Sequence, residues 1–192
     1  LGRFIGQHPQ VKIDLEEHLS GEVVRAVQEG AADLGVCNAQ ALGETGGTLQ
    51  LRPYRHDELA LVVPEGHPLR GRGAMPFADA LDFDHVGLHA NSSIALAMHQ
   101  AAARAGRAIR LRIRITGLDA MCRMIDNGLG VGVMPLRAFQ LMRGAARLTA
   151  IALQDDWARR DISLVARDFD TLPVTARALV EHLQATPDAL AA

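Results

Sequence analysis

The chain has 192 residues, 48% of them hydrophobic, so it can bury a substantial core in one domain or two small ones. Its 20 basic and 22 acidic residues give a net charge of −2, which argues against a nucleic-acid-binding surface spread over the chain, because phosphate binding requires clustered positive charge. No apolar run approaches the ~18 residues of a membrane span. Cys37 and Cys122 lie far apart in apolar segments, which favours buried free thiols over a disulfide and predicts a cytoplasmic protein.

The first elements form a strand–helix–strand unit. Apolar residues alternate with charged ones over 11–15, which predicts a half-buried strand. A helix is predicted from Ser20, a suitable cap, to Glu29, and Gly30 ends it. A short buried strand follows at 32–37. A unit of this size predicts two parallel strands joined by a right-handed crossover.

The next part of the chain holds two strands and a turn. Strands are predicted at Thr48–Arg52 and Glu58–Val63, and the second is apolar on both faces, which is typical of a central strand. Residues 70–76 contain two glycines and a proline, so we expect a first crossing between lobes there.

Strands and helices alternate again further on. The predicted strands are His85–His89, Arg110–Ile115, Gly128–Met134, Leu148–Leu153 and Asp161–Arg167, and the predicted helices are 77–81, 91–105, 118–127 and 173–184. A second crossing at 154–160 would give one lobe of residues 1–70 and 158–192 and another of residues 71–157. Open α/β sheets bind ligands beyond the carboxyl ends of their strands, near helix starts, so a cleft between the lobes is the expected binding site.

Three segments carry a resemblance to a known family. Glu29–Val36 reads EGAADLGV, Leu61–Leu69 reads LVVPEGHPL and Met124–Pro135 reads MIDNGLGVGVMP. In this order and spacing they resemble the effector-binding domain of LysR-type transcription regulators.

The resemblance implies an α/β fold of two Rossmann-like lobes with a ligand cleft between them, like a type 2 periplasmic binding protein. It implies a sensor of a small-molecule effector, not an enzyme, that needs no cofactor and assembles as a homodimer or homotetramer. The family's first strand, and the winged helix-turn-helix that reads DNA, would lie before Leu1 and are absent from this sequence.

Polar residues that carry hydrogen-bond donors at the predicted helix starts are the candidates for ligand contact. Ser20 combines a hydroxyl with free backbone N–H groups and matches a family position that contacts effector, although a plain capping role stays open. His89, Asn91, Ser92 and Ser93 surround the next such start, and polar groups there suit an organic acid or similar metabolite. Capping alone stays open for residues 91–93, and a surface or core position stays open for His89.

Thr116 and the glycine-rich segment at 128–132 complete the set of candidate ligand residues. Thr116 precedes a helix at a family position that faces the cleft, whereas the neighbouring Gly117 departs from the serine often found there. Gly130 and Val131 allow close backbone packing and are candidates for ligand contact. Arg110, Arg112 and Arg114 share one strand face, which we interpret as solvated.

A solute-binding protein and an enzyme are the two alternative functions for a chain of this kind. A solute-binding protein of a transport system would share the two-lobed fold, but a signal peptide or lipid anchor would precede it. An enzyme is disfavoured, because the sequence has no G-x-S-x-G and no G-x-x-x-x-G-K-[ST] motif, and no metal site is indicated.

Overall fold

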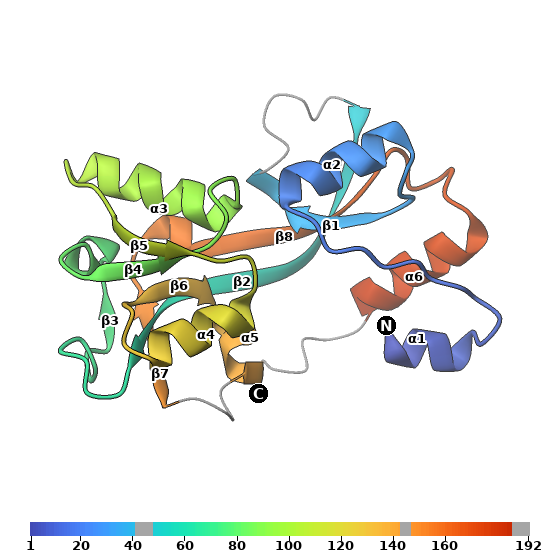
Figure 1. The fold of residues 1–192 in the computed structure, drawn as a ribbon. Helices are drawn as coiled ribbons and strands as arrows, with labels where there is room; N and C mark the ends of the chain where they lie inside the picture. The colour runs from blue at the N-terminus through green and yellow to red at the C-terminus, as the bar shows by residue number, and fades with distance from the viewer. Residues whose placement is uncertain (41–47, 143–146, 186–192) are drawn as a thin grey trace. The chain divides into compact units, whose positions relative to one another are not determined.

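A computed structural model describes residues 1–40, 48–142 and 147–185, and they divide into two compact units (Figure 1). Unit 1 consists of Leu1–His56 and Asp161–Ala192, and unit 2 of Asp57–Arg160. The chain passes between the units inside strand β2 and again inside strand β8. Among the described residues, no helix is long and apolar enough to cross a membrane.

Unit 1 packs helices against a small antiparallel sheet. Its elements are α1 (Gly2–Gln7), α2 (Ser20–Glu29), β1 (Gly35–Asn38), the first part of β2 (Gln50–Pro64), most of β8 (Arg159–Ala166) and α6 (Val174–Ala185). β1 pairs antiparallel with β8, with Val36 opposite Leu164. Val24 and Val27 of α2 pack on Cys37 and Val165 and form the core on this side of the sheet.

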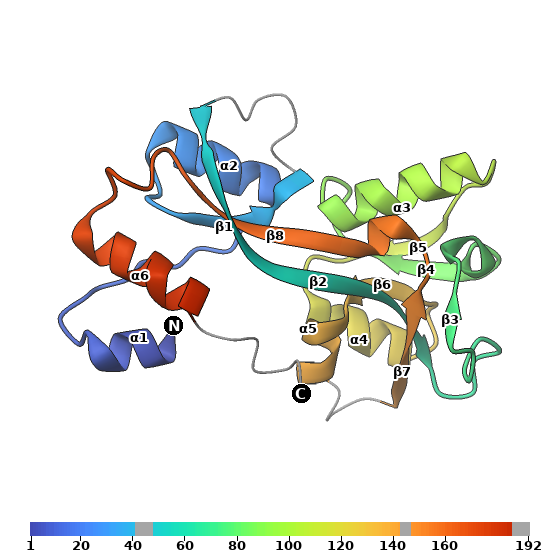
Figure 2. The same ribbon diagram turned by 180° about the vertical axis from the view of Figure 1, so that it is seen from behind.

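Unit 2 is built around the second half of β2. Its elements are β3 (Ala74–Met75), a 3-10 helix at Phe77–Ala80, β4 (Asp84–Gly87), α3 (Ser93–Arg104), β5 (Arg110–Arg114), α4 (Leu118–Asp126), β6 (Gly132–Pro135), α5 (Leu136–Met142), β7 (Leu148–Leu153) and a 3-10 helix at Asp156–Ala158. β2 pairs antiparallel with both β6 and β7, and β4 pairs in parallel with β5 (Figure 2). Leu59–Val63 of β2 are 0–2% exposed, as predicted for a central strand.

The prediction of a strand–helix–strand segment at the start of the chain is only partly correct. Residues 11–15 form no strand, and β1 pairs antiparallel with β8, so the predicted parallel pair is wrong. An extended segment becomes a strand only when a neighbouring strand takes up its hydrogen bonds, and residues 11–15 have no such neighbour among the described residues. Helix α2 and its end at Gly30, a left-handed residue with φ of 76°, are confirmed.

Several boundaries differ from the prediction. The strands expected at 48–52 and 58–63 are one continuous strand, β2: Pro53 lacks an N–H, but its fixed φ is compatible with an extended backbone and it does not end the strand. The strand expected at 128–134 shortens to β6, and the unpredicted helix α5 follows it. The two compact units divide at 56/57 and 160/161, and the predicted lobes of residues 1–70 with 158–192 and of residues 71–157 stay a prediction.

The glycine-rich segment packs against β4. Gly130 has a φ of 145°, and a Cβ added to it would lie 2.2 Å from the backbone oxygen of Asp84. The next residue, Val131, donates its N–H to that same Asp84 oxygen at 2.8 Å and accepts from the Val86 N–H at 2.8 Å. The expected close backbone packing is therefore observed.

We expect Gly130→Ala to lower the free energy of unfolding by about 2–4 kcal/mol, because the new methyl group collides with backbone and the φ value is unfavourable for alanine. Urea unfolding measures the change. Gly73→Ala is the control, because a Cβ there meets nothing within 4 Å and the φ is not left-handed. Equal stability of the two variants would contradict the packing role.

His85 of β4 is a fully buried titratable residue in the core of unit 2. Its side chain is 0% exposed, its Nδ1 lies 2.9 Å from the backbone oxygen of Phe83, and its ring meets Phe77 edge-on at a centroid distance of 5.8 Å. Burial lowers the pKa of His85, although the Phe83 oxygen and the nearby Asp84 charge partly oppose this. The imidazole is therefore neutral in the folded protein near pH 7.

A lowered folded-state pKa makes the unfolded chain bind more protons below pH ~6.5, the ordinary value for histidine. We therefore expect the free energy of unfolding to fall as the pH decreases from 7.5 to 5.5, and to fall less in His85→Leu. Urea unfolding at both pH values measures this difference. The control is His99→Gln, at an exposed position on α3, in which the free energy of unfolding should fall by as much as in the wild type. A pH dependence in His85→Leu equal to that of the wild type would refute the role given to His85.

Candidate functional site

Four of the predicted ligand residues meet at the start of α3. Ser92 is the N-cap, is 7% exposed, and its Oγ accepts the Ala95 N–H at 3.1 Å. Ser93 is the first helical residue and is half-buried. His89 and Asn91 are exposed in the preceding loop, where the Asn91 N–H lies 3.3 Å from His89 Nδ1 and the Ser92 N–H donates to the His89 oxygen. The loop is therefore a compact cluster of polar groups.

Ser20 lies at the start of α2 but does not cap it. Leu19 is the N-cap, and the Glu22 carboxylate accepts the Leu19 N–H at 3.2 Å. The predicted Ser20 cap is wrong, because the helix begins one residue earlier than expected and Ser20 becomes its first residue. Ser20 remains half-buried at the start of α2, and its contact with a ligand stays a prediction.

His18, which the sequence analysis missed, lies beside this helix start. Its Nε2 is 2.8 Å from Glu16 and its Nδ1 is 3.7 Å from Glu22. The hydrogen bond to Glu16 raises the pKa of His18, with help from both carboxylate charges. The i, i+4 spacing of His18 and Glu22 was the signal that could have revealed this cluster.

Thr116 is exposed just before α4, whose N-cap is Gly117. A Cβ on Gly117 would lie 2.7 Å from Asp119 Oδ1, the end of an exposed side chain that can turn away. The structure gives no reason for the departure from the family pattern at Gly117.

The three helix starts differ in their own charges. Glu22 lies in the first turn of α2 and Asp119 in the first turn of α4, whereas the first turn of α3 has no acidic residue. A helix start carries a partial positive charge that a first-turn carboxylate neutralises. The α3 start therefore keeps its attraction for an external anion, and it is the most suitable of the three for a carboxylate or phosphate.

Gly130 and Val131 have structural roles in their positions. Val131 is fully buried in the core of unit 2, and its backbone N–H and C=O both bond to β4. Gly130 is packed against the Asp84 carbonyl. A contact of either residue with ligand stays a prediction.

The predicted residues are divided between the units: Ser20 belongs to unit 1, and the others belong to unit 2. Two hollows are found within single units, and neither is lined by these residues. One, of about 700 Å³, lies in unit 1 between residues 11–16 and β1; the other, of about 390 Å³, lies in unit 2 beside α5 and β7.

Other chemistry is not favoured by the described residues. They contain no group of three or more His, Cys, Asp or Glu side chains arranged to hold a metal ion. Arg110, Arg112 and Arg114 are exposed on β5, and Asp84 lies 3.2 Å from Arg110 and 3.9 Å from Arg112, as expected for a solvated, charge-paired face.

Comparison with known proteins gives a consistent result. The family model for the LysR substrate binding domain matches residues 1–188. "Probable RuBisCO transcriptional regulator" proteins of Emiliania huxleyi and Trichormus variabilis are 23% and 25% identical over 168 and 156 residues, which cover 86% and 79% of this chain and 54% and 46% of those proteins. The chain thus spans about half the length of the curated relatives that it matches.

Solved structures with a similar fold include the Synechocystis PCC6803 CcmR regulatory domain in complex with 2-PG, with a TM-score of 0.86, 18% identity, and coverage of 98% of this chain and 89% of that one. The effector binding domain of QuiR in complex with shikimate gives a TM-score of 0.79, 15% identity, and coverage of 95% and 86%. The α/β fold is therefore the one expected, similar to type 2 periplasmic binding proteins. With residues 1–188 matched by its model, the chain belongs to the LysR substrate-binding domain family, a family of effector-binding regulatory domains and not of enzymes.

Proposed function

We propose that this chain senses a small organic acid for a cytoplasmic transcription regulator that binds DNA through an N-terminal winged helix-turn-helix. The observation that carries the organic acid is the start of α3, where hydroxyl and backbone donors gather without an acidic residue in the first turn. The family assignment favours a regulator over a solute-binding protein of a transport system.

The chemistry of the α3 start suits a carboxylate. The N–H groups of Ser93 and Ile94 belong to the first turn, where a helix leaves donors without an internal partner. The Ser93 hydroxyl adds a donor, and Ser92 holds the turn in place through its bond to Ala95. An anion here would accept several hydrogen bonds and face the positive end of the helix.

Two similar domains support a ligand of this class, because they are bound to 2-PG and to shikimate. We propose that the effector also contacts Ser20 and Thr116, so that it engages donors of both units in an interlobe cleft. Such a ligand favours one arrangement of the units in proportion to its difference in affinity for the two arrangements. We further propose that the whole protein acts as a homodimer or homotetramer.

The anion site is tested by the matched pair Ser92→Asp and Ser92→Asn. Both side chains can cap α3, and they differ by one negative charge. We expect Ser92→Asn to change affinity for a carboxylate effector by less than about threefold, and Ser92→Asp to weaken it at least about tenfold through charge repulsion. A thermal-shift screen of carboxylates and phosphorylated acids, led by shikimate and 2-PG, identifies the ligand, and calorimetry measures its affinity.

Equal affinities of the two variants would exclude anion binding at the start of α3. Thermal unfolding without ligand is the control, because both variants should melt close to the wild type if the cap is kept. A fall in melting temperature of Ser92→Asp alone would instead show that the charge is harmful to the fold.

A double-mutant cycle tests whether Ser20 and Ser92 act on one ligand. We expect Ser20→Ala to weaken effector binding severalfold, and the effects of Ser20→Ala and Ser92→Ala to be non-additive, because both residues touch the same molecule. Calorimetry of the four proteins measures the coupling. Thr171→Ala, which removes an exposed hydroxyl of unit 1, is the control and should leave affinity unchanged. Unchanged affinity in both serine variants would exclude the proposed contacts.

A further inference from the structure

The two strands that connect the units carry an unusual ion pair. β2 leaves unit 1 after His56, and β8 returns to it at Asp161. The two strands are neighbours in the sheet and lie side by side in both views (Figures 1 and 2). Asp57 and Arg160, the first and last residues of unit 2, form an ion pair from one strand to the other.

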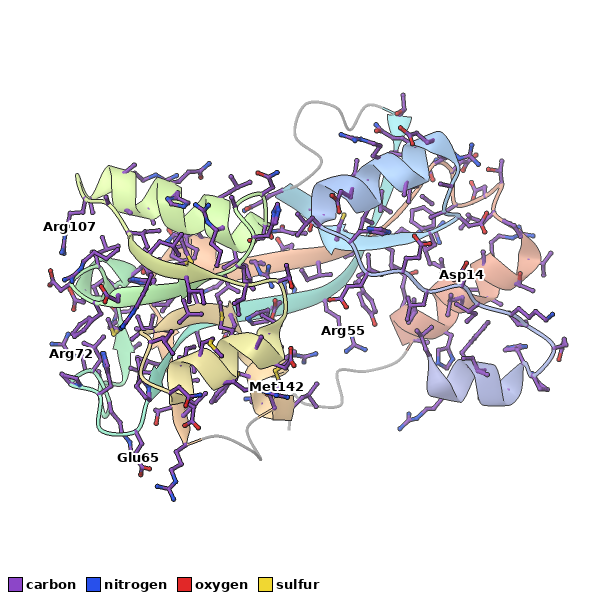
Figure 3. The ribbon with its side chains drawn as sticks, in the orientation of Figure 1. Asp14, Arg55, Glu65, Arg72, Arg107 and Met142 are labelled. Carbon is purple, nitrogen blue, oxygen red and sulfur yellow. The ribbon has the colours of Figure 1, made fainter. Side chains whose placement is uncertain are left out.

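Burial distinguishes this pair from surface pairs of the same unit. The Asp57 and Arg160 side chains are each only 11% exposed. In the pairs formed by Arg72 with Asp79 and by Arg107 with Asp82, at least 39% of each side chain is exposed. Arg72 and Arg107 are labelled at the periphery of unit 2 in Figure 3. Exposed pairs of that kind contribute little to stability, whereas removing one partner of a buried pair is strongly destabilising because it leaves an uncompensated charge.

The next residue pair toward unit 1 is much weaker. His56 Nδ1 lies 2.7 Å from Asp161 Oδ1, but these side chains are 94% and 73% exposed. The side chains of Asp57 and Arg160 therefore hold β2 and β8 together strongly, whereas those of His56 and Asp161, one residue further toward unit 1, do so only weakly.

Glycine does not supply a hinge here. Neither β2 nor β8 contains a glycine, so the side-chain pairs between the two strands are what distinguishes one position of the connection from the next. We propose that Asp57 and Arg160 form a clamp that fixes both connecting strands to unit 2, so that any bending between the units occurs at His56 and Asp161. The clamp follows from the contacts of this pair and does not depend on the identity of an effector.

A regulatory consequence rests on the proposed function. An effector that favours one arrangement of the units would act through the weakly tied residues His56 and Asp161, while the sheet of unit 2 keeps its geometry. The pair is thus a positioning device and makes no contact with ligand in this proposal.

Hydrogen–deuterium exchange of the 192-residue chain tests the clamp. We expect Asp57→Asn to speed amide exchange at 57–59 and 159–160 at least tenfold, while amides at 61–63 in the centre of unit 2 keep their rates. Asp161→Asn, which breaks the exposed pair with His56, is the matched control and should change exchange at 57–59 and 159–160 less than twofold. Equal effects of the two variants would overturn the proposal.

The charge-swapped variant Asp57→Arg with Arg160→Asp separates a specific pair from a general loss of stability. Restored slow exchange at 57–59 supports the clamp. If the swap does not fold, Arg160→Met replaces it, and the clamp then requires the same local pattern as Asp57→Asn. Faster exchange spread evenly over unit 2, in either variant, would show that the pair only stabilises the unit and would refute a clamp at the crossing.

Discussion

The buried half of β2 is the constraint on which unit 2 depends. Leu59–Val63 are shielded on both faces, so their backbone groups must be satisfied by other strands, and β6 and β7 do this from either side. These pairings determine where the neighbouring strands end and the next helices begin. The strand then continues into unit 1 without a break, and the connection between the units is therefore itself part of the sheet.

In the proposed site, helix starts supply the hydrogen-bond donors, and the charges in the first turn of each helix distinguish one start from another. α2, α3 and α4 each have a serine or a glycine at the N-cap or the first helical position, and from that alone they look equivalent. Glu22 and Asp119 already neutralise two of them. The start of α3 remains available, and its cap, Ser92, is held by a buried hydrogen bond, so the donors around it are preorganised and need little reordering when a ligand binds.

The motifs that reveal the family are mostly packing motifs. Gly35 lies where a Cβ would collide with Val23 and Val165, Gly130 is packed against the Asp84 carbonyl, and Leu69 of the HPL segment is buried in the core of unit 2. These positions tolerate few substitutions because neighbouring backbone and side chains fill the space around them. The residues expected to read the ligand lie elsewhere, on loops before helices, so family membership leaves the identity of the effector open.

Sequence patterns determined the elements whose signals are local. The helical stripes of α3 and α4, the apolar run of β2, the left-handed glycine that ends α2 and the cluster of polar residues before α3 all follow from neighbours in the chain. Tertiary structure decided the features that depend on distant partners. The antiparallel pairing of β1 with β8, the absence of a strand at 11–15 and the burial of Asp57 against Arg160 each require segments more than a hundred residues apart, or a missing neighbour, and no local pattern encodes these contacts. The start of α2 shows the same limit on a smaller scale, because Leu19, whose N–H bonds to the Glu22 carboxylate, is the cap in place of Ser20.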